Sequence, residues 1–178
     1  TYTPYATVDP EAIVCVSPSK AFNLAGLQIA NIVCPDADTR RLIDRAINDN
    51  EVCDVNPFGV IATEAAYRHG TEWLEQLIEY LWDNYRFMQD FCRDALPTLP
   101  ITRLEGTYLV WMDCRSLPFT SDELERKLLA DAKLWLNAGN MYGEDGEGFM
   151  RWNIACPRAV LAEGLNRFAD FVSEMNIR

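Results

Sequence analysis

The amino-acid sequence predicts a mixed α/β (α+β) fold, and three observations support this class. Short apolar runs rich in β-branched residues, which are typical of buried strands, alternate with segments whose apolar residues recur at helical spacing. The longest helical stripe covers residues 71–96 and predicts a long connecting helix between two parts of the chain. The chain has 178 residues, 49% of them hydrophobic, which is enough for a packed core.

Residues 1–70 are predicted to form the first part, with two strands followed by two helices. Pro35 ends the second apolar run, and Asn56–Gly59 is a turn signal. Gly70 follows directly on His69, where it is placed to cap the second helix at its C-terminus. The predicted elements are strands at 13–16 and 29–34 and helices at 36–50 and 60–69.

Residues 71–96 are predicted to form the connecting helix and residues 97–178 a small C-terminal α/β domain. Thr71 is expected to cap the connecting helix, which Pro97 stops. The segment 137–148 holds four glycines and is expected to be a mobile loop. The elements predicted for the C-terminal domain are strands at 107–113, 133–136 and 149–155, a helix with a capping box at Thr120–Glu123, and a final helix that starts at Pro157.

Composition and charge favour a cytoplasmic protein that binds neither nucleic acid nor membranes. The net charge of -11 disfavours contact with a phosphate backbone or an anionic lipid surface. No apolar run approaches the roughly 20 residues of a membrane span, and the N-terminus lacks a signal-peptide pattern. The six cysteines form no Cys-x-x-Cys pair and are expected to be reduced thiols. The single histidine, His69, has no zinc-ligand spacing around it, so no metal site is expected.

The segment 13–28 carries the first chemical signal, because it places Lys20 between an apolar strand and an apolar, glycine-containing run. A lysine enclosed in this way can lose its proton and act as a nucleophile. Ser17 and Ser19 precede it, and hydroxyls in a strand-to-loop turn can help to bind a phosphate. Taken by itself, the motif is better explained as an ordinary loop lysine beside two turn serines, because short motifs often match by chance.

Arg151 carries the second signal, because it lies inside the apolar strand predicted at 149–155. A buried guanidinium requires an anion, and its planar fork suits a carboxylate held by two hydrogen bonds. Two partners fit: the carboxylate of a ligand, or an internal Asp or Glu in a salt bridge, which is the favoured partner if Arg151 is considered alone. Arg158, in the first turn of the final helix, is expected to be exposed.

Together the two motifs resemble the class I/II aminotransferase superfamily of fold-type-I pyridoxal-phosphate (PLP) enzymes. The first is Ser-x-Ser-Lys followed by Phe-Asn-Leu-Ala-Gly-Leu, and the second is Arg-x-Asn-x-Ala-x-Pro-Arg. In detail, the residues of these motifs resemble the PatB/MalY-type carbon–sulfur lyases, which include cystathionine β-lyases. Further supporting segments occur in the family's order at 3–6, 65–67, 70–74 and 105–109.

This resemblance implies a role for each matched residue. Lys20 would bind PLP covalently and later move the α-proton of the substrate. Ser17 and Ser19 would help to hold the cofactor phosphate, and Arg151 would bind the α-carboxylate of a small amino-acid substrate. Gln28 stands where many relatives carry a phosphate-binding arginine. This departure weakens one phosphate contact and fits the lyase branch better than ordinary aminotransferases.

The implied activity is cleavage of amino-acid C–S bonds by β-elimination, of the cystathionine β-lyase type, in a homodimer. The alternatives are a PLP-dependent aminotransferase and, from another class, a non-catalytic aminotransferase-like module of a regulator. Family members carry most of their cofactor domain before the lysine, which is residue 20 here. The chain therefore resembles the C-terminal part of such an enzyme, with residues 1–70 as the end of the large cofactor-binding domain. It is expected to be inactive alone.

Overall fold

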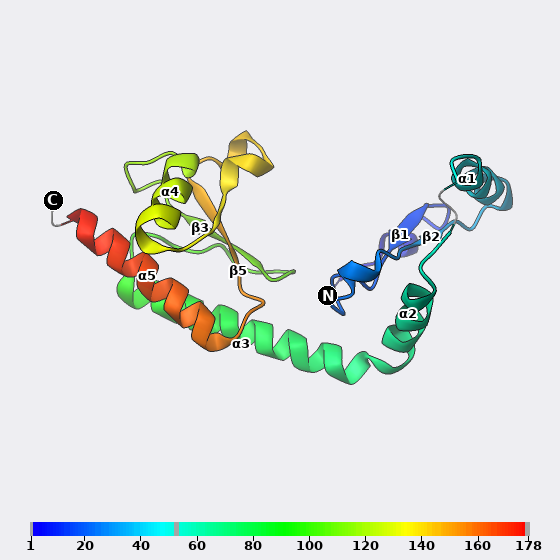
Figure 1. The fold of residues 1–178 in the computed structure, drawn as a ribbon, viewed down its shortest axis with the longest axis horizontal. Helices are drawn as coiled ribbons and strands as arrows, with labels where there is room; N and C mark the ends of the chain where they lie inside the picture. The colour runs from blue at the N-terminus through cyan, green and yellow to red at the C-terminus, as the bar shows by residue number, and fades with distance from the viewer. Residues whose placement is uncertain (1, 52–53, 177–178) are drawn as a thin grey trace. The chain divides into compact units, whose positions relative to one another are not determined.

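The structure is a computed structural model that describes residues 2–51 and 54–176 (Figure 1). Helices and small sheets alternate along the chain, which confirms the predicted mixed α/β class. The chain divides into two compact units, Thr1–Gln76 and Leu77–Arg178. The division falls within the long helix α3 (Thr71–Ala95), whose bounds match the predicted connecting helix to within one residue.

In the first unit, a two-stranded antiparallel sheet precedes two helices. Strands β1 (Val14–Val16) and β2 (Asn31–Val33) pair with Cys15 opposite Ile32. Both lie inside the predicted strand ranges. Helix α1 (Ala37–Asp49) begins after Asp36, whose side chain accepts a hydrogen bond from the Thr39 N–H. The carboxylate of Asp36 therefore caps the N-terminus of α1, which explains why this short, exposed helix starts where the sequence predicts.

Helix α2 (Pro57–His69) begins three residues before the prediction. The segment Asn56–Gly59, predicted as a turn, is its first turn. The Asn56 side chain accepts from the Phe58 N–H, and Pro57 occupies the first helical position. A proline is tolerated there because its missing N–H would have no partner inside the helix.

Gly70 joins α2 to α3 without an intervening loop. Its N–H donates to Ala66, which confirms the predicted C-cap, and its carbonyl accepts from the Leu74 N–H. Helix α3 therefore starts at Thr71, and the prediction that Thr71 caps it is wrong. A Cβ at position 70 would lie 2.5 Å from the Ala66 carbonyl oxygen and 2.5 Å from the Phe22 ring, so only glycine fits.

The second unit is built on a three-stranded antiparallel sheet. Its order is β3 (Leu109–Asp113), β5 (Phe149–Asn153) and β4 (Asn137–Ala138). Side chains of β3 and β5 alternate between buried and half-buried, as expected for a sheet with one covered face. The register sets Arg151, in the central strand, opposite Trp111 on one side and Asn137 on the other.

Helix α4 (Ser121–Lys127) carries the predicted capping box at Thr120 and Glu123, which is confirmed. A π-helical turn, Leu128–Ala132, extends it to Lys133, whose φ of 53° ends the helix. The strand predicted at 133–136 is wrong, because this left-handed residue breaks the extended backbone that a strand needs. Helix α5 (Arg158–Asn176) begins directly after Pro157.

The glycine-rich segment 137–148, predicted to be a mobile loop, has regular structure. It contains β4 and two 3-10 turns, Gly139–Tyr142 and Glu144–Gly146. The backbones of Gly139 and Gly146 pass so close that a Cβ on either would overlap the carbonyl oxygen of the other. Local hydrogen bonds, including Gly146 N–H to the Gly143 carbonyl, support these turns.

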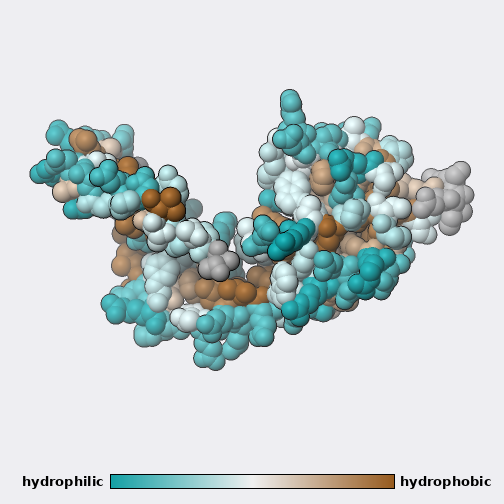
Figure 2. All heavy atoms as spheres, turned by 180° about the vertical axis from the view of Figure 1, so that it is seen from behind, coloured by the Kyte–Doolittle hydropathy of each residue, from teal (hydrophilic) through white to brown (hydrophobic). Residues whose placement is uncertain are grey.

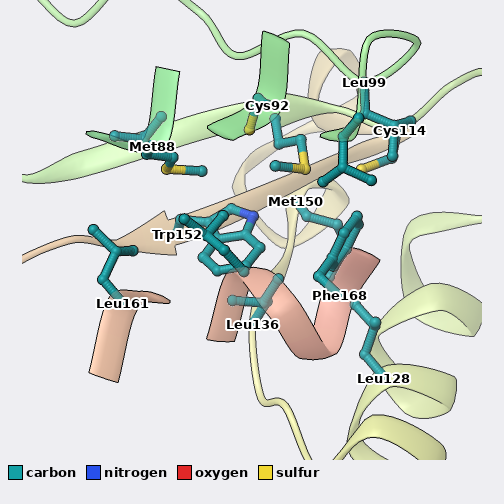
Figure 3. Packing of buried hydrophobic residues seen from close by; sticks show 14 of the residues in the cluster. Met88, Cys92, Leu99, Cys114, Leu128, Leu136, Met150, Trp152, Leu161 and Phe168 are labelled. Carbon is teal, nitrogen blue, oxygen red and sulfur yellow. The ribbon is translucent and has the colours of Figure 1, made fainter. Parts of the chain in front are cut away.

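One hydrophobic core lies within the second unit, between the sheet and helices α3 and α5. Phe168 of α5 packs edge-to-face on Trp152 of β5, with ring centroids 5.6 Å apart (Figure 3). Met88 of α3 and Met150 of β5 are fully buried in the same cluster. Figure 3 shows side chains from all these elements converging on the indole of Trp152.

The first unit, in contrast, buries few side chains. Ile13, Val16, Ile32 and Val33 are all exposed on or beside its small sheet. Figure 2 shows apolar residues at the surface of this unit as well as on the second. Within the described part of the chain, no helix is both long enough and apolar enough to cross a membrane.

The described cysteines are unpaired. Cys15 is exposed, Cys34, Cys92 and Cys114 are buried, and Cys156 is half-buried. The sixth, Cys53, lies outside the described residues. Among residues 2–51 and 54–176, no group of three His, Cys, Asp or Glu side chains could hold a metal ion.

Candidate functional site

Lys20 lies in a hydrogen-bonded turn that follows β1. The Phe22 N–H donates to the Pro18 carbonyl at 2.9 Å, and the Leu24 N–H donates to the Ser19 carbonyl at 3.0 Å. Lys20 itself is exposed. The apolar runs on either side of it in the sequence do not cover its side chain in this chain, so the predicted apolar enclosure is absent here. What the turn provides is a primary amine presented at a fixed point of the backbone.

The two serines of this turn have different roles in the hydrogen bonding. The Ser17 hydroxyl donates to the Ile29 carbonyl at 2.6 Å and accepts from the Ser19 N–H at 3.1 Å. A hydroxyl has a single proton, so in this arrangement Ser17 organises the turn and cannot also donate to a phosphate. Ser19 is half-buried, and its hydroxyl has no hydrogen-bond partner among the described residues.

Gln28 lies at the end of the 3-10 turn Ala25–Leu27, in the same unit as Lys20. It is exposed, and its φ of 50° and ψ of 52° place it in the left-handed region. Non-glycine residues adopt this conformation infrequently. The short turn thus presents an uncharged amide where the resemblance predicts that many relatives carry an arginine.

Arg151 lies in the central strand of the second unit, enclosed by an amide and an aromatic ring. Its Nη2 donates to Asn137 Oδ1 at 2.8 Å, and its guanidinium carbon lies 4.3 Å from the centroid of the Tyr142 ring. The Nε of Arg151 is buried without a hydrogen-bond partner in the part of the chain that the structure describes. No ion pair joins Arg151 to a carboxylate within those residues. The internal salt bridge that the sequence left open is therefore not seen.

An aromatic cavity lies beside Arg151. Trp111 contacts Tyr142 edge-to-face at 5.6 Å and Phe149 at 6.4 Å. The cavity has a volume of about 340 Å³ and is lined by Thr102, Trp111, Tyr142, Asp145, Gly146 and Phe149. Sequence reasoning did not predict Asn137 or Tyr142 as neighbours of Arg151, because the strand register brings Asn137 to it and the path of the glycine-rich segment brings Tyr142.

Arg158 was predicted to be exposed, and this prediction is wrong. It is half-buried, its Nε donates to Asn84 Oδ1 at 2.7 Å, and its guanidinium carbon lies 4.7 Å from the Phe87 ring centroid. The Asn84 amide in turn donates to the carbonyls of Ile154 and Cys156, at 2.8 and 3.0 Å. This network ties the segment after β5 to helix α3.

Two further features of the second unit perturb the pKa of ionisable groups. A two-pronged ion pair with Arg115, with N···O distances of 2.9 and 2.6 Å, holds the pKa of Asp113 below its ordinary value of 3.8. Burial raises the pKa of the Cys92 thiol to about 11 and that of Cys114 to about 12. Both buried cysteines are thus protonated, unreactive side chains at neutral pH.

Comparison with protein families matches residues 3–168 to the family described as aminotransferase class I and II. The chain belongs to this family. It is 36% identical, over 176 residues, to cystathionine beta-lyase PatB of Bacillus subtilis (strain 168), which covers 97% of this chain and 46% of that protein. The predicted family, including its similarity to C–S lyases, is confirmed.

Solved structures of other proteins in the comparison have the same fold. Cystalysin from Treponema denticola, whose structure contains pyridoxal 5'-phosphate, matches with a TM-score of 0.92 at 28% identity, over 98% of this chain and 45% of that one. A PLP-bound C–S lyase from Staphylococcus hominis matches with a TM-score of 0.82 at 30% identity, over 95% of this chain and 45% of that one. This member of the class I and II family therefore spans about half the length of the relatives it matches. The roles of Lys20, Ser17, Ser19 and Arg151 stay predictions.

Proposed function

We propose that the whole protein is a PLP-dependent enzyme that cleaves the C–S bond of small amino acids by β-elimination, as a cystathionine β-lyase does. The observation that carries this proposal is the 36% identity to cystathionine beta-lyase PatB along 97% of the chain. The structural similarity to cystalysin and to a C–S lyase supports it. Residues 1–70 then belong to the large cofactor-binding domain, residues 71–96 to the connecting helix and residues 97–178 to the small domain.

The residues present fit the part of a PLP site that a lysine and a serine can supply. Lys20 offers a primary amine on an ordered turn, and Ser19 next to it has a hydroxyl without a partner among the described residues. Lys20 would hold the cofactor covalently and Ser19 would contact its phosphate, while Ser17 fixes the turn from which both project. When bound, PLP supplies an electron sink for the pair released at Cα.

Arg151 and Lys20 have separate tasks in this reaction. Arg151 binds the substrate α-carboxylate through its remaining N–H groups, which orients the amino acid. The amine of Lys20 takes the proton from Cα. The C–S bond then breaks and its electron pair leaves from Cβ with the thiolate sulfur. The imine that remains is hydrolysed by water to a keto acid and ammonia.

Borohydride reduction of the whole protein loaded with PLP tests the assignment of Lys20. Peptide mapping distinguishes Lys20 from Lys127 and Lys133, the other lysines of these 178 residues, and from any lysine elsewhere in the whole protein. We expect the reduced cofactor on Lys20, and we expect Lys20→Ala to abolish labelling while Lys133→Ala, the control, retains it. A cofactor attached to another lysine would overturn the assignment.

The reaction type is tested with cystathionine as substrate. A lyase releases keto acid, ammonia and thiol without any added keto acid. An aminotransferase needs an amino-group acceptor and releases no ammonia, and a non-catalytic module does neither. Turnover that depends on an added keto acid would therefore contradict β-elimination.

Arg151→Ala in the whole protein tests the carboxylate role. We expect weaker substrate binding by about 1.5–3 kcal/mol, the range for a hydrogen bond to a charged group, with PLP still bound. Arg103→Ala is the control, because Arg103 is an exposed arginine in the same unit, 86% exposed at its side chain. An unchanged kcat/KM in Arg151→Ala would count against the role.

We also propose that the whole protein is a cytoplasmic homodimer. The exposed side chains of Ile13, Val16, Ile32 and Val33 in the first unit form apolar surface that favours a covering partner. Unpaired cysteines suit a reducing compartment. Sedimentation velocity on the whole protein tests the assembly, and a monomer at micromolar concentration would contradict it.

A further inference from the structure

Asn137 is placed to hold Arg151 by the pairing of two strands. The register of β4 and β5 sets Asn137 directly opposite Arg151, so both side chains project from the same face of the sheet. Asn137 Oδ1 accepts from Arg151 Nη2 at 2.8 Å, and both residues are half-buried. One nitrogen of the guanidinium is therefore fixed by a group that is itself fixed by the backbone.

Tyr142 packs against the same guanidinium. Its ring centroid lies 4.3 Å from the guanidinium carbon, within the distance of a cation–π contact. Trp111 meets the Tyr142 ring edge-on at 5.6 Å, with an angle of 84° between the ring planes, and Trp111 also lies opposite Arg151 across β3 and β5. Asn137 thus holds one nitrogen of the guanidinium by a hydrogen bond, and Tyr142 contacts the group through its ring.

This arrangement leaves both hydrogen-bonding capacity and positive charge on Arg151. Its Nε is buried and has no partner in the described part of the chain, and a buried unpaired donor is costly unless a ligand satisfies it. Asn137 accepts a hydrogen bond without carrying a negative charge. An aspartate in the same place would form an ion pair with Arg151 and compete with a bound carboxylate.

We propose that Asn137 and Tyr142 are positioning residues that hold the Arg151 guanidinium in place for the substrate carboxylate. Because the amide of Asn137 is neutral, the positive charge of Arg151 stays available to that carboxylate. This inference rests on the proposed role of Arg151. It adds that the identity of residue 137 sets the affinity for carboxylates, because an acidic residue there would occupy the site from within the protein.

The deciding variant is Asn137→Asp in the whole protein, because aspartate has nearly the same shape and accepts the same hydrogen bond. We measure kcat and KM with cystathionine, and by calorimetry the Kd of 3-(methylthio)propionate, which has the carboxylate and the sulfur but no amine to react. If residue 137 must be neutral, KM and Kd rise by about tenfold or more, the scale of one lost charge-assisted contact, and kcat changes less than KM. Asn137→Ala raises both by a smaller factor.

A purely structural role predicts the opposite order, with Asn137→Asp close to wild type and Asn137→Ala the worse variant. That result would overturn the inference, provided that thermal melting shows both variants folded. For Tyr142, the Phe variant keeps the ring and should bind like wild type, whereas Tyr142→Leu should weaken binding. Equal affinities of these two variants would remove Tyr142 from the proposal.

Arg151→Ala separates the two levels of inference. If it binds 3-(methylthio)propionate as tightly as wild type does, the carboxylate role of Arg151 fails, and the inference on Asn137 fails with it. If Arg151→Ala weakens binding but Asn137→Asp does not, only the inference on Asn137 fails.

Discussion

Asn84 is the one fully buried amide side chain of the described core, and its replacement by alanine tests the network it forms. The change removes two hydrogen bonds to backbone carbonyls and one from Arg158. The Cys156 carbonyl keeps a hydrogen bond from the Tyr80 hydroxyl at 3.4 Å, so the main losses are at Ile154 and Arg158. A buried acceptor left unpaired and a lost bond to a charged group together cost about 2–4 kcal/mol.

The assay is urea unfolding of the 178-residue chain, followed by tryptophan fluorescence. With a slope of about 2 kcal/mol per molar urea, the expected loss lowers the midpoint of the second unit's transition by about 1–2 M. Gln89→Ala is the matched control on the same helix, since Gln89 is exposed and makes one long hydrogen bond to Tyr85. Its stability should stay within about 0.5 kcal/mol of wild type. A loss for Asn84→Ala as small as that of the control would refute the reasoning.

Three further outcomes are expected. Asp113→Asn should destabilise the chain at pH 7, because the hydrogen-bonded ion pair with Arg115 holds the pKa of the folded-state carboxyl below 3.8. The deficit should shrink as pH falls through that lowered pKa, and a deficit that stays constant as pH is lowered would contradict the ion pair. Iodoacetamide at pH 8 should label Cys15 in the native chain, but Cys92 and Cys114 only after unfolding, since burial raises their pKa values to about 11 and about 12; peptide mass spectrometry checks this. The 178-residue chain mixed with PLP and cystathionine should release no keto acid, because it spans 46% of a related lyase and leaves Lys20 exposed; turnover like that of ordinary enzymes would show that this chain is sufficient.

Hydrophobic periodicity predicted the long helices well, because a helix that is buried on one side has apolar residues at helical spacing. Helix α3 and the capping box of α4 are where the sequence places them. The errors occur where backbone conformation depends on a single residue. Lys133 adopts a left-handed conformation that ends a helix, so an apolar run that resembled a strand is not one. The segment Asn56–Gly59 was predicted as a turn, but Pro57 is already the first residue of helix α2.

The candidate site could be predicted only in part. Lys20 and Arg151 stand out because each is a cation within an apolar run. Asn137 and Tyr142 do not stand out, since their relation to Arg151 is created by strand register and by the path of a glycine-rich segment. Arg158 was misjudged because the first turn of a helix is usually solvated, and its buried partner Asn84 lies 74 positions away in the sequence.

The close backbone passage between Gly139 and Gly146 restricts how this segment can evolve. The obstacle at each position is the main chain of the other, which no side-chain substitution elsewhere can move away. A second mutation therefore cannot compensate for a larger residue at either site. A library randomised at both should return glycine at both, even under weak selection for folding. Lineages can change the chemistry of this segment at exposed positions such as Met141, while the two glycines stay the same.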